Sequence, residues 1–142
     1  MHQRTVAREA AAPKIRQQGA PFARPLFFLA LLAIGALSLV PGEIRAHTGL
    51  PGPAEHFAAY AGAGLLLAVG YAATRQRLVG LLGLATASGV LELLQHFSPG
   101  RHPSVDDALA STCGAAFGTG AGAALLAILM AKLVTAHARG EN

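Results

Sequence analysis

The sequence predicts an all-α membrane protein, a four-helix transmembrane bundle with both termini in the cytoplasm. Of its 142 residues, 53% are hydrophobic and only 13% are charged, a composition typical of membrane proteins. Charged residues are gathered in short stretches between apolar runs of eighteen or more uncharged residues. A soluble helix would instead carry charged side chains along one face at every turn or so.

The chain begins with a basic segment, residues 1–24, which holds five of the eleven Lys and Arg residues. It lacks a hydrophobic periodicity that would bury one face, so we expect a disordered tail. The first apolar run, residues 25–40, follows it. A signal peptide would show a small-residue cleavage site after such a run, and none stands at the right distance. The run is therefore predicted to be a retained transmembrane helix.

Three further helices are expected after the Pro41-Gly42 break, at residues 55–74, 78–97 and 106–134. Residues 75–77, a very short basic turn, join the first two of these as an antiparallel hairpin. Prolines and a glycine break the chain between 98 and 105, which is predicted to be a loop. The membrane domain then spans residues 25–134, and a polar tail follows at 135–142.

The distribution of positive charge predicts the orientation. Nine of the eleven Lys and Arg residues lie in the N-terminal segment, the 75–77 turn and the C-terminal part, whereas the other two loops hold only Arg45 and Arg101. By the positive-inside rule, the termini are cytoplasmic and both longer loops are outside. Five of the seven acidic residues lie at or beyond the outer ends. Any chemistry is therefore expected to face outward.

Three expected helices carry polar residues at their outer ends. On residues 78–97, Ser88, Glu92 and Gln95 share one face, and Glu92 lies inside the helix end, where a buried carboxylate needs a partner. On residues 55–74, His56 and Tyr60 are spaced by four. On residues 106–134, polar Asp107 and Ser111 begin a stripe of small residues that lets membrane helices approach closely, namely Gly114, Gly118 and Gly122.

We predict that these residues form an outward-facing polar pocket, in which Arg101 reaches either carboxylate through a two-pronged hydrogen bond. The candidate binding residues are His56, Tyr60, Glu92, Gln95, Arg101, Asp107 and Ser111. A plainer interpretation stays open for each element. The third helix can simply end in water, the histidine can be an interfacial residue, and Asp106 or Asp107 can cap the last helix.

No metal site and no cofactor is predicted. Enough nitrogen and oxygen ligands for zinc are present in Glu92, His96, His56, Asp107 and His102, but the chain has no His-Glu-x-x-His pair and no cysteine cluster. The glycines at 118–122 lie in the middle of a helix and do not form a phosphate-binding loop. Basic residues flank apolar runs and do not form a nucleic-acid-binding patch. The single cysteine, Cys113, is expected to pack inside the bundle.

The order of these residues resembles the VanZ-like family of small bacterial membrane proteins. The resemblance covers residues 52–118 and rests on four short motifs: His56-Phe57-x-x-Tyr60, Glu92-x-x-Gln95, Pro99-Gly100-Arg101, and Asp107 with Ala110 and Gly114. The chain departs from the family at Gly52-Pro53, where members often carry Asp-Lys, and at Ser111, where they often carry Asn. The resemblance implies a multi-pass protein of the cytoplasmic membrane and, for the founding member, a role in low-level teicoplanin resistance.

Three functions stand as hypotheses. The leading one is a cell-envelope protein whose pocket binds a lipid head group or a cell-wall precursor, with glycopeptide (teicoplanin) resistance or tolerance as the outcome. The second is a membrane-embedded hydrolase or transferase on lipid-linked substrates, with Glu92 or Asp107 as base and His56 as acid, or with a metal assisting. The third is a non-catalytic partner subunit. The lipid bilayer is a partner in each and nucleic acid in none, and the oligomeric state stays open.

Overall fold

The computed structural model of the chain describes residues 19–44 and 49–140, which form four α-helices, one short 3-10 helix and no β-strand. The elements are α2 (Ala23–Leu39), η1 (Gly42–Ile44), α3 (Gly52–Gly70), α4 (Thr74–Gln95) and α5 (Val105–Ala138). The all-helical fold predicted from the sequence is confirmed. Most of the segment predicted as a disordered tail, residues 1–18, lies outside the described residues, as do 45–48 and 141–142.

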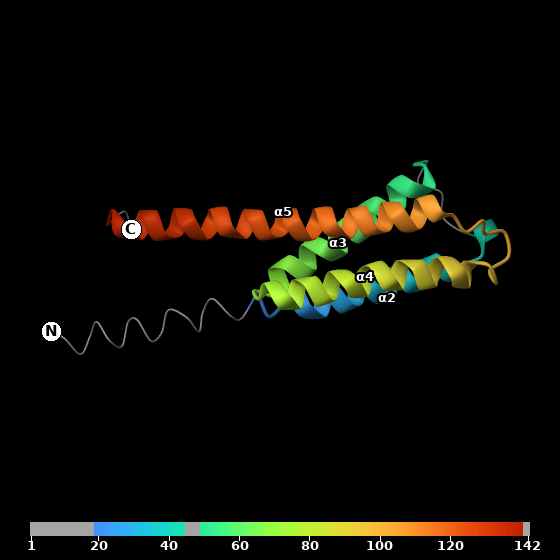
Figure 1. Ribbon diagram of the computed structural model, residues 1–142, viewed down its shortest axis with the longest axis horizontal. Coiled ribbons are helices and arrows are strands. Elements are labelled where there is room, and N and C mark those ends of the chain that lie inside the picture. Colours follow the sequence, from blue (N-terminus) through green and yellow to red (C-terminus); the bar gives the residue numbers. More distant parts are fainter. Residues whose placement is uncertain (1–18, 45–48, 141–142) are drawn as a thin grey trace.

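Consecutive helices run in opposite directions along one long axis (Figure 1). The start of α2, the α3–α4 turn and the C-terminal part of α5 lie toward one end, which we call the turn end. At the opposite end, which we call the loop end, η1 lies beside the α4–α5 connection. Main-chain hydrogen bonds tie each end together, from Ala20 N–H to the Val69 carbonyl (2.9 Å) at the turn end and from Gly42 N–H to the Pro99 carbonyl (3.0 Å) at the loop end.

The α3–α4 turn falls earlier than the sequence predicted. α3 begins at Gly52 because Pro53 suits the first turn of a helix, where its missing N–H leaves no bond unmade. α3 ends at Gly70, and α4 begins at Thr74, so the basic residues 75–77 are helical and do not form the turn. Arg77 then reaches back to α3 and donates to the carbonyls of Tyr71 (2.6 Å) and Ala68 (2.9 Å).

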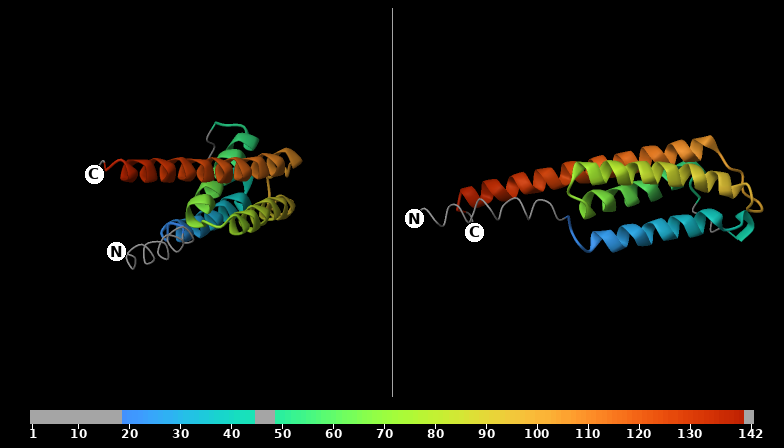
Figure 2. Two further views of the ribbon diagram at one scale, coloured as in Figure 1. Left: turned by 60° about the vertical axis from the view of Figure 1, so that its left-hand side comes forward. Right: turned by 60° about the horizontal axis from the view of Figure 1, so that its bottom comes forward.

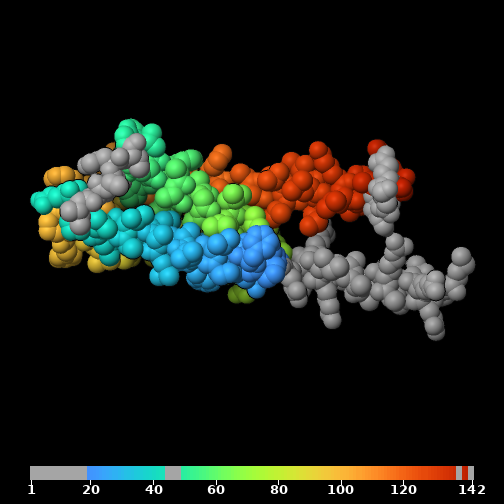
Figure 3. Space-filling model, turned by 180° about the vertical axis from the view of Figure 1, so that it is seen from behind, coloured from blue at the N-terminus to red at the C-terminus, as the bar shows by residue number. Residues whose placement is uncertain are grey.

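The other helix boundaries differ by smaller steps. α4 ends at Gln95, two residues before the predicted end, and Glu92 therefore stands in its last turn. α5 continues to Ala138, past the predicted end at 134. The C-terminal part of α5 projects beyond the other described helices (Figures 2 and 3).

The most extensive contact between helices joins α3 and α5. Four glycines lie in this contact: Gly64 against Ala115, Gly114 against Phe57, Gly118 against Ala61, and Gly122 against Leu65 and Ala68. At the first three of these positions a Cβ atom would collide with the main chain of the facing helix. The small residues therefore set how closely α3 and α5 approach, as in other membrane helix pairs.

Most large apolar side chains of the described chain face outward. α4 and α5 are long and apolar enough to cross a membrane, and only 22% and 17% of their apolar windows are buried. α2 is also apolar but shorter, with 17 residues. The core helices of a soluble protein would be mostly buried, so this distribution is typical of helices that face lipid.

Cys113 is exposed on α5, which corrects the prediction that it packs inside the bundle. The face of α5 that meets α3 is taken by Ser111, Gly114 and Gly118, all of which are buried. Cys113 is two residues after Ser111 and one before Gly114, so the helical repeat turns it away from that face.

Candidate functional site

Three helices bring His56, Glu92 and Asp107 together at the loop end. His56 lies near the start of α3, Glu92 in the last turn of α4 and Asp107 in the first turn of α5. Because neighbouring helices run in opposite directions, these three helix ends meet at the same end of the bundle. His56 Nδ1 lies 3.9 Å from Glu92 Oε1, and His56 Nε2 lies 4.0 Å from Asp107 Oδ2. We call these three side chains the His56 cluster.

The His56 cluster is largely removed from water. The side chains of His56, Glu92 and Asp107 are 13%, 8% and 16% exposed. The distances of 3.9 and 4.0 Å exceed the length of a hydrogen bond. The imidazole ring thus lies between two carboxylates without bonding directly to either of them. Charge-capable groups gathered this closely out of water are costly to bury, which distinguishes the cluster from ordinary surface charges.

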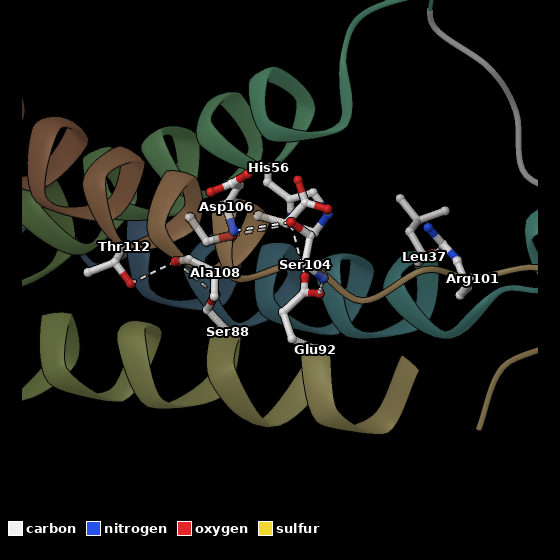
Figure 4. A network of polar contacts seen from close by, with 11 residues as sticks. Leu37, His56, Ser88, Glu92, Arg101, Ser104, Asp106, Ala108 and Thr112 are labelled. Carbon is white, nitrogen blue, oxygen red and sulfur yellow. Dashed lines mark hydrogen bonds and ion pairs between the residues drawn. The ribbon is translucent and has the colours of Figure 1, made fainter. Parts of the chain in front are cut away.

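Each member of the cluster is held in a different way. His56 Nδ1 lies 3.2 Å from Ser111 Oγ, and Ser111 is fully buried on α5. Glu92 Oε2 accepts a hydrogen bond of 3.1 Å from the Ser104 N–H, which leaves Oε1 turned toward the histidine (Figure 4). Asp107 Oδ1 is buried and has no hydrogen-bond partner within the described residues.

Ser104 and Gly52 also shape the site, although the sequence argument did not select them as site residues. Ser104 Oγ accepts a hydrogen bond of 3.1 Å from the Asp106 N–H and so caps α5. The spacing Ser104-Val-Asp-Asp resembles a capping box and is the signal that points to this role. Gly52 lies close to Asp107, since a Cβ there would stand 3.3 Å from Asp107 Oδ1.

Tyr60, Gln95 and Ser88 line the same helices close to the cluster. Tyr60 is 2% exposed, and Ser88, also 2% exposed, donates to the Ala108 carbonyl (3.4 Å). Gln95 is 3% exposed, and its Nε2 has no hydrogen-bond partner within the described part of the chain. Tyr60 follows His56 by four residues and Gln95 follows Glu92 by three, so each lies on the face that carries the cluster residue.

Arg101 does not join the cluster, which corrects the predicted pocket. Its Nε donates to the Val40 carbonyl (2.9 Å), and its Nη2 donates to the Leu37 carbonyl (2.6 Å). Figure 4 shows Arg101 beside Leu37 and apart from His56 and Glu92. The physical reason is that the last carbonyls of α2 lack helical partners, and a guanidinium in the neighbouring loop can satisfy two of them.

An apolar cavity lies at the turn end, away from the His56 cluster. It has a volume of about 470 Å³ and is lined mainly by Phe27, Phe28, Leu67, Tyr71 and Val79. Its lining is suited to an acyl chain or to side chains of a neighbouring helix, and it brings none of the predicted site residues together.

Among the described residues, His56, Glu92 and Asp107 form a group that could hold a metal ion. Each offers one ligand atom, and these atoms lie within 4.8 Å of one another. His96 and His102, which were weighed as zinc ligands from the sequence, are exposed and do not belong to this group.

No family model matches this chain, and neither a curated protein nor a solved structure matches it. The fold and the site therefore define the class of protein by themselves. The described part of the chain is all-helical, with two helices long and apolar enough to cross a membrane and a largely buried cluster of one imidazole and two carboxylates.

Proposed function

We propose that the chain is a multi-pass protein of the bacterial cytoplasmic membrane, in which α2, α3, α4 and α5 are four spans and both termini are cytoplasmic. Support comes first from helix length. The 17 and 19 residues of α2 and α3 rise about 25 and 28 Å, close to the ~30 Å thickness of the hydrocarbon core. Small mismatches of this size are absorbed by thinning of the bilayer and by flanking residues.

Charge at the two ends supports the same topology. Arg24, Arg75 and Arg77 lie at the turn end, which the positive-inside rule assigns to the cytoplasm. The five acidic side chains of the described residues belong to the loop-end half: Glu43, Glu55, Glu92, Asp106 and Asp107. The His56 cluster then faces the outer surface of the membrane.

Labelling of single cysteines tests this topology. In a Cys113→Ser background, a cysteine replaces exposed Pro99 at the loop end or exposed Gln76 at the turn end. In intact cells, a maleimide that cannot cross membranes should label the first variant and not the second, and both should be labelled after lysis. Labelling of the Gln76 variant in intact cells would show that the turn end faces outward, opposite to the proposed orientation.

The function that the His56 cluster supports best is recognition of a polar head group, carried by a lipid or by a lipid-linked cell-wall precursor. The single observation that carries this proposal is the convergence of His56, Glu92 and Asp107 from three helices into a largely buried group whose members lie beyond hydrogen-bond distance of one another. The two carboxylates and the imidazole favour a ligand with hydroxyl, amine or amide groups. In keeping with the resemblance to VanZ-like proteins, we propose tolerance of teicoplanin as the physiological outcome.

A complementation experiment tests this function. A strain that lacks the gene receives the wild type, His56→Ala, Glu92→Gln or Asp107→Asn, and the inhibitory concentration of teicoplanin is measured. Matched controls are His96→Ala and Asp106→Asn, because both side chains are exposed outside the cluster. We expect the cluster variants to lose most of the protection at equal protein level and the controls to keep it. Full protection by all three cluster variants would remove the cluster from the function.

One observation favours an enzymatic alternative. An imidazole flanked by two carboxylates is an arrangement suited to proton transfer, so a hydrolase or transferase acting on lipid-linked substrates is the second candidate. Ser111 is fully buried, which argues against it as a nucleophile. Turnover of a lipid-linked precursor by the purified protein, abolished by His56→Ala and retained by His96→Ala, would establish the enzyme. Binding of the precursor without turnover would favour the recognition function.

A further inference from the structure

The three side chains of the His56 cluster lie at distances close to those between the ligands of a metal ion. Glu92 Oε1 lies 3.9 Å from His56 Nδ1 and Asp107 Oδ2 lies 4.0 Å from His56 Nε2, distances too long for hydrogen bonds. Two ligands of a tetrahedral ion, each about 2.0–2.2 Å from it, stand roughly 3.3–3.6 Å apart. One ligand atom from each of the three residues lies within 4.8 Å of the others, so these atoms need to approach by up to about 1.3 Å around a central ion, which rotation of the side chains can supply.

The chemistry of the ligand atoms favours one class of metal ion over others. Two carboxylate oxygens and one imidazole nitrogen form a mixed oxygen and nitrogen set, and imidazole favours zinc and related transition ions over magnesium or calcium. Two ionised carboxylates also match the charge of a divalent cation. Three protein ligands leave a fourth tetrahedral position open, which is the arrangement of zinc sites that bind water or substrate.

The neighbours of the cluster already hold the ligands as the outer shell of a metal site would. Metal-bound histidines usually donate their second ring N–H to a nearby acceptor, and Ser111 Oγ stands 3.2 Å from His56 Nδ1. With that bond made, Nε2 remains for the ion on the side of Asp107 Oδ2. Ser104 N–H holds Glu92 Oε2 and leaves Oε1 beside His56 Nδ1, so Oε1 has to turn toward the Nε2 side of the ring to share the ion.

A second observation concerns the carboxylate of Asp107. Asp107 Oδ1 is buried without a hydrogen-bond partner among the described residues, although a carboxylate oxygen out of water ordinarily accepts a hydrogen bond. Oδ1 lies beside Gly52, while Oδ2 faces His56. A carboxylate that the described residues bond this incompletely can rotate to offer either oxygen to an ion at the cluster.

We propose that His56, Glu92 and Asp107 bind one divalent transition metal ion of the zinc type, with an open position that faces the head group. This inference deepens the proposed function and rests on it for the role of the open position. A bound metal would extend the recognised chemistry to an anionic oxygen, such as a phosphate of the head group, which carboxylates alone would repel.

Metal binding is tested on the purified full chain in detergent micelles, with an affinity tag that contains no histidine. After treatment with a chelator, Zn²⁺ is added in competition with a chromophoric indicator, and bound zinc is also counted by mass spectrometry. We expect one Zn²⁺ per chain, and at least a tenfold weaker affinity in His56→Ala and Asp107→Asn. The matched controls His96→Ala and Asp106→Asn should stay within twofold of the wild type. Mg²⁺ at the same concentration should not displace zinc.

Cobalt substitution provides a measurement that a folding defect would not imitate. Co²⁺ in the wild type should show the visible absorption of a four-coordinate site, and Asp107→Asn should lose it while keeping the wild-type helical circular dichroism. Zinc binding that is equally strong in His56→Ala, or no stoichiometric zinc in the wild type, would overturn the proposal.

The outcomes for the metal and for the proposed function are separable. If the wild type binds no zinc but the cluster variants still lose teicoplanin protection, the metal fails and the recognition function stands. If zinc binds at the cluster and protection is unchanged in every cluster variant, the metal site stands and the recognition function fails.

Discussion

The two ends of the bundle use their charged side chains differently. At the turn end, Arg24 donates to the Gly70 carbonyl (3.0 Å), and Arg77 donates to two carbonyls at the end of α3. At the loop end, Arg101 does the same for α2, but His56, Glu92 and Asp107 face one another without direct hydrogen bonds. The arginines donate to main-chain carbonyls at helix ends, whereas the side chains of the His56 cluster face one another.

The helix ends explain why this difference is informative. A guanidinium near the C-terminus of a helix is favoured, since it meets unpaired carbonyls and the negative end of the helix dipole. Glu92 has the opposite charge and yet stands in the last turn of α4, where the dipole disfavours an anion. Its position is therefore unfavourable for α4 alone, and the hydrogen bond from the Ser104 N–H and the neighbouring imidazole offset this cost.

The largest expected effect concerns the contact that holds the cluster together. Gly114→Leu should destabilise the protein by about 3 kcal/mol or more, because the new side chain collides with the main chain at Phe57. It should also move Asp107 and Ser111 away from His56 and abolish zinc binding. Thermal unfolding in detergent measures the first effect. Gly120→Leu is the matched control, because nothing lies within 4 Å of a Cβ there. Equal unfolding temperatures for Gly114→Leu and Gly120→Leu would contradict the close α3–α5 packing.

At the turn end, Arg77→Met should lower the free energy of unfolding by about 2 kcal/mol, since two hydrogen bonds from a charged donor are lost. Zinc affinity should be unchanged, because the His56 cluster lies at the opposite end. Arg75→Met, at an exposed position two residues earlier, should be nearly neutral. A loss of metal binding in Arg77→Met would show that the two ends are coupled.

Arg101→Gln tests whether the loop-end arginine contributes to stability alone or also to the function of the His56 cluster. Loss of its bonds to Leu37 and Val40 should reduce the free energy of unfolding by about 1.5 kcal/mol. This is less than for Arg77 because one of the two bonds is exposed to solvent. Teicoplanin protection per molecule of protein should remain. If protection falls as far as in His56→Ala at equal protein level, Arg101 acts on the ligand after all.

The smallest effect is expected from Ser111→Ala. It removes the neighbour of His56 Nδ1 and should destabilise the protein by about 1 kcal/mol. Zinc affinity should fall by about tenfold, as for other outer-shell partners of metal-bound histidines. Thr112→Ala is the adjacent control, because Thr112 Oγ1 donates to the carbonyl of Ala108 in its own helix. Equal zinc affinity in the wild type and Ser111→Ala would mean that Nδ1 is not oriented by the serine.

Much of the fold could be predicted because its signals are local. Apolar runs between Pro and Gly breaks indicated four helices, and the small-residue stripe on the last helix includes the glycines that pack against α3. The α3–α4 turn was misplaced because the Arg75-Gln76-Arg77 run has the composition of a loop. Only the contact of Arg77 with the end of α3 shows why these residues are helical.

The sequence by itself determined the number of helices, their alternating direction and the gathering of acids toward one end, because these follow from hydrophobic length and charge along the chain. The tertiary structure decided which polar residues meet. It placed His56 between Glu92 and Asp107 and turned Arg101 to the end of α2. Partners between helices depend on how closely the helices approach and how they are rotated, and spacing within one helix does not contain that information.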